Sequence, residues 1–197
     1  MLLGEILSGR RLILASASPR RRQLLAGLDV GFELAQPYSV EERWPEEMAP
    51  EQVPQYLSVL KSDGYPRELL PDDILLTADT VVITDGRILG KPAGEDDASR
   101  MLGMLSGRTH TVITGVTLRG PERRHTFSTE SYVRFRRLDD EEIRYYVQRY
   151  RPFDKAGSYG IQEWIGYVGI ESIEGSFYNV MGLPVQRLYC ELKEFCK

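Results

Sequence analysis

The chain has little cysteine and little histidine, and this scarcity excludes several kinds of protein. It contains two residues of each type among 197. Cys190 and Cys196 lie on different faces of an expected C-terminal helix, so no disulfide is expected between them. His110 and His125 stand apart from both cysteines, which excludes a zinc cluster of the usual spacing. Reduced cysteines are typical of a cytoplasmic protein.

Long apolar stretches are also absent. The chain has no run of about twenty uncharged apolar residues, so no membrane-spanning helix is expected. Its first residues, MLLGEILSGRRLIL, lack the early basic segment and the cleavage site of a signal peptide, and Glu5 interrupts their apolar run. We therefore expect a cytoplasmic protein with no membrane partner.

The chain has no excess of positive charge either. Its net charge of -4 excludes non-specific binding to nucleic acid, which usually needs a basic surface. One segment, VRFRRL at 133–138, alternates arginines with apolar residues. The two-residue period of a strand predicts that Val133 and Phe135 point inward while the arginines face solvent. We expect no nucleic-acid partner.

What the sequence does contain is an alternation of strand and helix patterns without long linkers or repeats. This order predicts an α/β domain with a mixed sheet. The expected strands are 12–14, 32–37, two strands within 73–92 around an Asp85-Gly86 turn, and a hairpin over 108–138 that turns at Gly120-Pro121. The expected helices begin at Pro19 and near Pro184 and cover 51–65, 94–107 and 139–150. Residues 38–50 are expected to form an acidic loop, and 154–184 loops and short strands.

The turn after the first strand carries an unusual concentration of positive charge. In LILASASPRRR, the strand leads into Ser16, and Ser18 is placed to cap a helix whose first residue is Pro19. Arg20, Arg21 and Arg22 follow, although cations at a helix start oppose the helix dipole. An anionic ligand at this turn would reverse that cost. The pattern therefore indicates a binding site for an anion.

Asp79 stands out because its strand, ILLTADTVVI, is otherwise apolar. A carboxylate buried in such a strand costs several kcal/mol unless it is paired or bound to a metal. Two interpretations are open at this point. Asp79 either accepts hydrogen bonds from backbone at a bulge, with help from Thr80, or it carries chemistry.

Further charged residues could complete a site around Asp79. Each is commonplace alone, because isolated lysines and acidic loop residues usually face solvent. Together with the cationic turn they supply what a polyphosphate–magnesium site requires, since lysine and arginine neutralise phosphate and carboxylates hold Mg2+. These additional candidates are Glu41, Glu42, Lys61, Lys91 and Lys155.

Six motifs, in order along the chain, resemble those of the Maf family of nucleoside triphosphate pyrophosphatases. They are LASASPRR, ADTVV, GKP, LSGRTHTVITGV, DKAGSYGIQ and NVMGLP. The resemblance implies a single Maf-like α/β domain over residues 1–197, with an elongated mixed sheet, flanking helices and two lobes around a cleft, similar to inosine triphosphatase-like enzymes. It also implies hydrolysis between the α- and β-phosphates of a nucleoside triphosphate, a divalent cation (Mg2+ or Mn2+) and a homodimer.

The resemblance also assigns roles to individual positions. Asp79 matches the proton acceptor, and Glu42, with Glu41 as the alternative, matches the acidic loop residue. These two carboxylates would bind the metal. Lys61 falls in VLKSDGY, which departs from the usual Glu-Lys-Ala of the family. The remaining catalytic and phosphate-binding positions are Lys61, Lys91, Ser16, Arg21 and Lys155.

The nucleotide base would be selected at three further positions, which are Arg20, Thr80 and Gln162. The family divides into a dTTP/UTP group and a 7-methylguanosine triphosphate group, and glutamine at position 162 matches the first. A glutamine amide offers one donor and one acceptor to the pairing edge of uracil or thymine, whereas guanine presents two donors that suit a carboxylate. A loop-stabilising hydrogen bond is the alternative role for Gln162.

Two function classes follow from these observations. The first is a pyrophosphatase that acts on dTTP and UTP, and on modified pyrimidine nucleotides. The second is a nucleotide-binding regulator of septum formation with little catalysis, which the family's name suggests. Asp79 and the lysines favour the enzyme, because a sensor would not need a positioned base.

Overall fold

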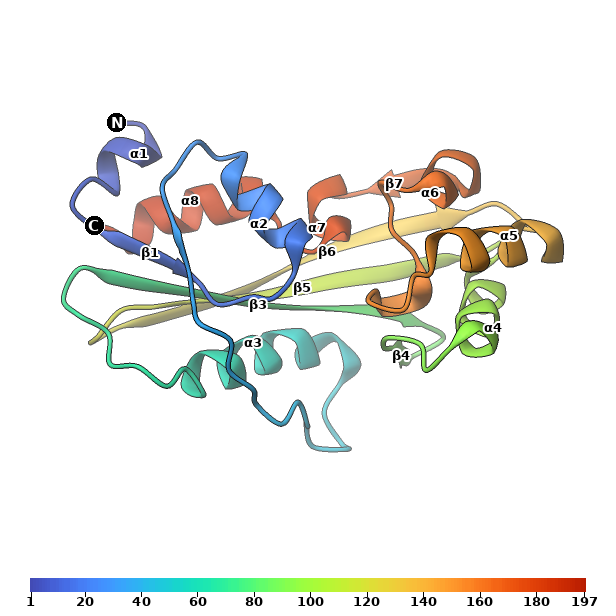
Figure 1. The fold of residues 1–197 in the computed structure, drawn as a ribbon, viewed down its shortest axis with the longest axis horizontal. Coiled ribbons are helices and arrows are strands. Elements are labelled where there is room, and N and C mark those ends of the chain that lie inside the picture. The colour runs from blue at the N-terminus through green and yellow to red at the C-terminus, as the bar shows by residue number, and fades with distance from the viewer. The chain divides into compact units, whose positions relative to one another are not determined.

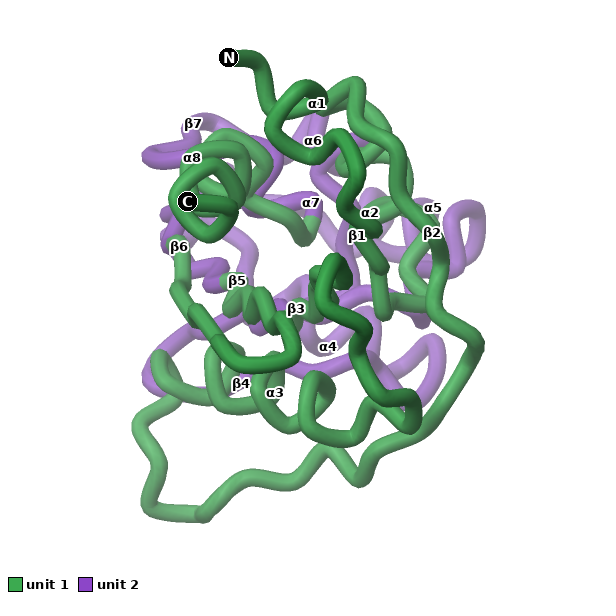
Figure 2. Tube along the Cα trace, turned by 90° about the vertical axis from the view of Figure 1, so that its left-hand side faces the viewer, with its two compact units in different colours: residues 1–79, 114–129, 182–197 green, residues 80–113, 130–181 purple.

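A computed structural model describes residues 1–197, which divide into two compact units (Figure 2). Unit 1 comprises residues 1–79, 114–129 and 182–197, and unit 2 comprises residues 80–113 and 130–181. Each unit is therefore assembled from segments that are distant in the sequence. The boundary between Asp79 and Thr80 falls inside a strand.

A mixed sheet of seven strands confirms the predicted α/β class (Figure 1). The strand order is β2-β1-β3-β5-β6-β7, and β4 pairs with β3. The strands are β1 (Arg11–Leu14), β2 (Glu33–Leu34), β3 (Asp73–Thr84), β4 (Arg87–Leu89), β5 (Thr109–Arg119), β6 (Arg124–Phe135) and β7 (Ile170–Glu174). β1 runs parallel to β2 and β3, whereas the β3–β4 and β6–β7 pairs are antiparallel.

In unit 1, helices cover both faces of the strands. The helices are α1 (Leu3–Ile6), α2 (Pro19–Ala26), α3 (Val53–Asp63) and α8 (Val185–Phe195). α3 lies on one face, and α2 and α8 lie on the other (Figure 1). α2 begins as predicted, with Pro19 in its first turn and the Ser18 hydroxyl accepting a hydrogen bond from the Arg21 amide. The parallel register pairs Leu12 with Ile74, which places apolar side chains of neighbouring strands side by side.

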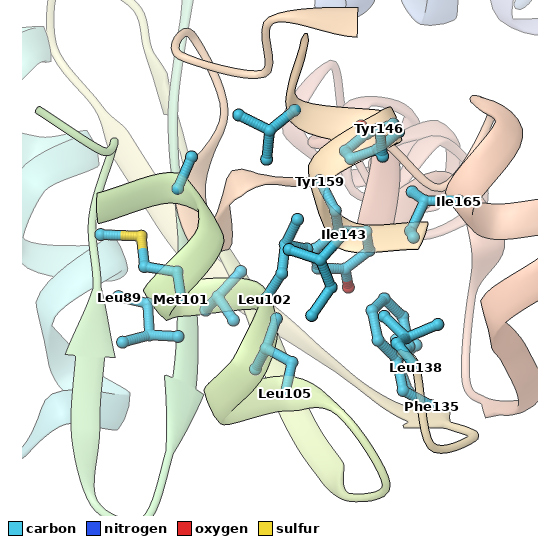
Figure 3. Packing of buried hydrophobic residues seen from close by; sticks show 14 of the residues in the cluster. Leu89, Met101, Leu102, Leu105, Phe135, Leu138, Ile143, Tyr146, Tyr159 and Ile165 are labelled. Carbon is cyan, nitrogen blue, oxygen red and sulfur yellow. The ribbon is translucent and has the colours of Figure 1, made fainter. Parts of the chain in front are cut away.

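Unit 2 has its own apolar core between helices and strands. Its helices are α4 (Glu95–Leu105), α5 (Asp140–Tyr150), α6 (Trp164–Gly169) and α7 (Phe177–Met181). Met101 and Leu102 of α4 lie in one buried cluster with Ile143 and Tyr146 of α5 (Figure 3). Asp139 caps α5 by accepting a hydrogen bond from the amide of residue 142 at 2.8 Å.

The turn between β3 and β4 follows the prediction closely. Asp85 and Gly86 have φ values of 49° and 70°, and two successive positive values define the hairpin turn that an Asp-Gly pair favours. β5 and β6 also form the expected hairpin. At the end of β6, Val133 and Phe135 are buried while Arg134 is exposed, which confirms the predicted alternation.

Three expected segments are present with different bounds or additional elements. The strand expected over 32–37 contains only Glu33–Leu34, both exposed at the edge of the sheet. The segment 154–184, expected to hold loops and short strands, also contains α6 and α7. The helix expected over 51–65 is confirmed as α3 (Val53–Asp63), and a 3-10 turn at Pro50–Gln52 precedes it. No helix is long and apolar enough to span a bilayer.

Candidate active site

Asp79 and Lys61 form the centre of the candidate site in unit 1. The Lys61 ammonium lies 2.5 Å from Asp79 Oδ1 and 3.1 Å from Glu42 Oε2. The Asp79 side chain is 12% exposed and that of Lys61 is 18% exposed. The buried carboxylate in the apolar strand is therefore paired with a cation from α3, and one ammonium joins two carboxylates.

The structure distinguishes Glu42 from Glu41, which the sequence left open. Glu41 pairs with Arg43 at 2.8 Å, and both side chains face solvent. Glu42 reaches Lys61 instead. The departure of VLKSDGY from the family pattern does not displace the lysine, because Lys61 lies on the face of α3 that meets Asp79.

Arg21 is tied to backbone on two sides. Its Nε donates to the Gly182 carbonyl and its Nη1 donates to the Ala78 carbonyl, each at 2.8 Å. Burial lowers the pKa of the guanidinium, and the charge of Asp79 opposes that effect. Arg21 thus fixes the backbone immediately before Asp79. Its sequence-assigned contact with phosphate stays a prediction.

The Ser-x-Ser-Pro turn is held by its own hydroxyls. The Ser18 amide donates to the Ser16 hydroxyl at 3.2 Å, and Ser18 in turn caps α2. Arg20 is half-buried in the first turn of α2. Ser16, Arg20 and Arg21 therefore lie together around one helix N-terminus, where an anion is favoured.

A second group of predicted residues lies in unit 2. The Gly157 amide donates to the Gly90 carbonyl at 3.1 Å, which joins the segment around Lys91 to the segment around Lys155. Gly157 has a φ of 67°, and an added Cβ would lie 3.0 Å from Val82, so only glycine suits this close approach. Lys91 is exposed.

Lys155 is buried and its charge is already balanced. Its ammonium lies 2.7 Å from Asp154 Oδ1 and 3.1 Å from Glu163 Oε1. Glu163 also accepts a hydrogen bond from the Tyr146 hydroxyl, which itself accepts one from the Gly160 amide at 3.0 Å. Burial raises the pKa of Tyr146, and the bond to Glu163 adds to that effect.

Sequence reasoning missed Glu163 and Tyr146. The only signal for Glu163 is that it is the acidic residue directly after Gln162, because the sequence does not show that Lys155 is buried and Asp154 is the nearer carboxylate. Tyr146 carries no such signal, since its place on the inner face of α5 is typical of a core residue.

Gln162 and Thr80 are both partly buried in unit 2. The side-chain oxygen of Gln162 is buried and has no hydrogen-bond partner. A buried acceptor without a donor is costly, which makes this oxygen available to a donor on a ligand. The alternative role for Gln162, a loop-stabilising hydrogen bond, is not made through this oxygen.

The two histidines lie outside these groups. His110 is buried in β5, where its Nε2 lies 2.8 Å from the Tyr159 hydroxyl. Burial lowers the pKa of His110 to about 4. His125 pairs with Glu191 at 2.7 Å. His125 is therefore a satisfied polar residue, whereas His110 is bonded through Nε2 alone and its buried Nδ1 has no hydrogen-bond partner.

The residues of unit 1 fit a divalent cation in one particular way. No group of three or more His, Cys, Asp or Glu side chains is arranged to hold a metal ion. Asp79 and Glu42 supply two carboxylates that converge on Lys61. Mg2+ is commonly held by one or two carboxylates together with substrate phosphates, so this donor set fits the ion when a polyphosphate is present.

Comparisons with known proteins agree with this arrangement of motifs. A dTTP/UTP pyrophosphatase of Porphyromonas gingivalis is 54% identical over 187 residues, covering 94% of each chain. Proteins of the same name from Phocaeicola vulgatus and Flavobacterium psychrophilum are 50% and 42% identical, covering 96% and 97% of this chain and 98% and 97% of theirs.

A HAM1 protein from Coxiella burnetii has the same fold, with a TM-score of 0.51 at 14% identity, covering 94% of this chain and 99% of that one. The model of the Maf-like protein family matches residues 11–195. With nearly the whole chain matched, this protein belongs to the Maf family.

Proposed function

We propose that this protein is a nucleoside triphosphate pyrophosphatase that hydrolyses dTTP and UTP to the monophosphate and pyrophosphate. The names of the relatives at 42–54% identity support this substrate class. The observation that carries the proposal is the buried Asp79 carboxylate, held by Lys61 beside Glu42. A positioned carboxylate can act as a general base toward a water molecule bound beside it.

In the proposed reaction, Asp79 accepts a proton from the attacking water. The water oxygen then bonds to the α-phosphorus, and the bond from that phosphorus to the bridging oxygen breaks. The electron pair leaves with pyrophosphate, whose developing charge needs cations. Lys61, whose ammonium lies beside Asp79, is proposed to stabilise this developing charge on the pyrophosphate. One such contact is worth about 10²–10³ in rate.

The phosphate tail is proposed to bind at the N-terminus of α2, with Ser16, Arg20 and Arg21 around it. Backbone amides and the positive end of the helix dipole favour phosphate there. Lys91 is proposed to neutralise phosphate charge as well, and its exposure supports this. Lys155 is assigned the same role, although Asp154 and Glu163 already balance its ammonium.

Glu42 and Asp79 are the residues proposed to hold Mg2+ or Mn2+, through carboxylate oxygens. The bound ion would supply Lewis-acid polarisation of the phosphate oxygens. The two carboxylates also orient Lys61 between them, which keeps its ammonium directed at the site.

Base selection is assigned to Gln162, Thr80 and Arg20. The unpartnered buried oxygen of Gln162 supports this, because uracil and thymine carry an N–H donor on their pairing edge. An incorrect base would leave that oxygen without a partner, and a site built in this way discriminates strongly.

The test is a pyrophosphate-release assay with the purified protein and a panel of canonical and modified triphosphates, with and without Mg2+ or Mn2+. We expect release from dTTP and UTP. Asp79→Asn should keep the fold, measured by circular dichroism, and lose turnover by at least about 10²-fold. Native turnover in Asp79→Asn would overturn the assigned base.

The alternative function, a nucleotide-binding regulator of septum formation with little catalysis, is not favoured by the names of the relatives. Binding of dTTP without product in the same assay would support it. The single domain with two lobes around a cleft, and the homodimer, stay predictions of the resemblance. Sedimentation equilibrium tests the dimer.

A further inference from the structure

Two bonds connect β3 with α3, and only one of them involves the proposed catalytic pair. Asp79 of β3 meets Lys61 of α3, as described above. Two residues earlier on the strand, the Thr77 hydroxyl donates to the carbonyl oxygen of Ser58 at 2.7 Å. Alternate residues of a strand share a face, and residues three apart on a helix share a side. The two contacts are therefore adjacent, and both join α3 to β3.

The contact between Thr77 and Ser58 is extended by a chain of hydrogen-bonded hydroxyls. Ser58 Oγ donates to the Gln55 carbonyl at 2.8 Å and also lies 2.8 Å from Thr117 Oγ1 of β5. Thr117 Oγ1 lies 3.1 Å from Thr126 Oγ1 of β6. Because a hydroxyl has one hydrogen, Thr117 is the donor to Ser58, and Thr126 is then the donor to Thr117.

These hydroxyls are closed to solvent. Thr77, Ser58 and Thr117 are each 0% exposed. Water cannot replace a bond that is lost there, and a misaligned hydroxyl would be left unsatisfied. Apolar contacts tolerate sliding of a helix over a sheet, whereas directional hydrogen bonds select one register. The network thus restricts α3 to one position along β3.

We propose that Thr77 is a positioning residue for catalysis, acting with Ser58 and Thr117 to set the register at which Lys61 meets Asp79. The catalytic part of this inference rests on the proposed function. Although the lysine side chain is flexible, its reach is finite, so the backbone position of α3 determines the side-chain conformation in which the Lys61 ammonium meets the Asp79 carboxylate. A misplacement of about 1 Å can cost about 10²-fold in rate.

The experiment measures kcat and KM for dTTP hydrolysis in Thr77→Val, with Thr77→Ser as the conservative variant. We expect kcat to fall about 10-fold in Thr77→Val with KM within about 2-fold, and Thr77→Ser to restore most of the loss. The matched control is Thr129→Val, because the Thr129 hydroxyl is buried without a hydrogen-bond partner. This control should keep native kcat.

A double-mutant cycle separates positioning from general destabilisation. If Thr77 acts through Lys61, adding Thr77→Val to Lys61→Met should change kcat by less than about 2-fold. An equal loss in both backgrounds, or native kcat in Thr77→Val, would overturn the proposal.

A structural readout keeps this proposal separate from the proposed function. Crystal structures of the native protein and Thr77→Val should differ in the Lys61–Asp79 ion pair, which should open in the variant. If the native protein releases no pyrophosphate, the proposed function fails. The comparison of the Lys61–Asp79 ion pair in the two structures still tests whether Thr77 sets the position of α3. An unchanged ion pair would overturn the proposal. Should Thr77→Val fold poorly, Thr117→Val provides the same comparison.

Discussion

Gly115 of β5 lies directly against the carbonyl group of Pro54 at the start of α3. A Cβ added at Gly115 would overlap the Pro54 oxygen and the neighbouring Gln55 amide, which are backbone atoms that cannot rotate away. The helix approaches the sheet this closely only because position 115 has no side chain. Close approach at this end and hydroxyl contacts at Ser58 together define where α3 lies.

Replacing Gly115 by alanine should therefore force α3 away from the sheet. We expect Gly115→Ala to lower the free energy of unfolding by about 1–3 kcal/mol, as overpacked sites do, and to reduce kcat. Gly103→Ala is the matched control, because an added Cβ there meets nothing within 4 Å and the residue lies in α4. That change should raise stability by about 0.5–1 kcal/mol. Urea unfolding measures both, and equal stabilities would contradict the prediction.

Glu42 and Glu41 provide a test of the acidic loop. Glu42 forms an ion pair with Lys61, whereas Glu41 forms one with the exposed Arg43. Glu42→Gln should lower kcat/KM by at least about 10-fold and raise the Mg2+ concentration needed for half-maximal activity. Glu41→Gln should leave both quantities unchanged. The opposite ranking of the two variants would assign the role to Glu41.

Gln162 should control the choice of base. Gln162→Glu replaces a side chain that can donate and accept with one that only accepts. We expect kcat/KM for dTTP and UTP to fall by about 10²-fold, while thermal stability stays close to native. Parallel assays with 7-methylguanosine triphosphate measure the change in preference. Unchanged selectivity would remove Gln162 from this role.

Lys155 and Glu163 should be coupled more strongly than an exposed ion pair. The Lys155 side chain is 9% exposed and that of Glu163 is 20% exposed. A double-mutant cycle of Lys155→Met and Glu163→Gln should give a coupling free energy above about 1 kcal/mol. The same cycle on Lys197 and Glu194, which are 73% and 65% exposed, should give less than about 0.5 kcal/mol. Similar coupling free energies for the two pairs would contradict the prediction that burial strengthens the Lys155–Glu163 pair.

His110 should make stability depend on pH. Burial holds its pKa near 4, below the ordinary value of 6.5, so the unfolded chain binds the proton more readily than the folded one between these values. Stability is thus complete above pH 6.5 and is lost as the pH falls toward 4. We expect a loss of about 2–3 kcal/mol between pH 7 and 4.5 from this group.

The His110 contribution can be isolated by comparison of two variants. His110→Gln should remove that part of the pH dependence, and His125→Gln, at an exposed position, should retain it. Urea unfolding across the pH range measures the slopes. If the free energy of unfolding of His110→Gln depended on pH as it does in the native protein, other groups would be the cause of the loss of stability at low pH.

Local signals made much of the fold predictable. Ser18 and Pro19 mark the start of α2, and Asp85-Gly86 marks the turn between β3 and β4, because capping and positive φ depend on the residues themselves. The helices within 154–184 could not be predicted in the same way. In α6, an added Cβ on Gly166 would overlap the Ile161 carbonyl, so the glycine is required by a contact and not by a loop. From composition alone, a glycine-rich segment such as 154–184 is expected to form loops.

The candidate site was predictable in its residue types and less so in its pairing. Asp79 was identified because a charge in an apolar strand needs a partner. Lys61 was named as one of several candidate cations, but its pairing with Asp79 was not predicted, because no spacing rule connects a strand to a helix eighteen positions earlier in the chain. The Thr77–Ser58 contact lay beyond prediction, because threonine in a strand is ordinary and its bond depends on how α3 packs.

The division of the chain into interleaved segments sets an order for its synthesis on the ribosome. Every residue of unit 2 has been translated once Met181 is made, whereas unit 1 still lacks α8 at that moment. Until the last stretch of polypeptide leaves the exit tunnel, only α2 covers the face of the unit 1 strands on which α8 later lies (Figure 1). Nascent chains that stall before Gly182 therefore lack α8 and leave apolar surface of unit 1 exposed, the condition under which incomplete chains aggregate.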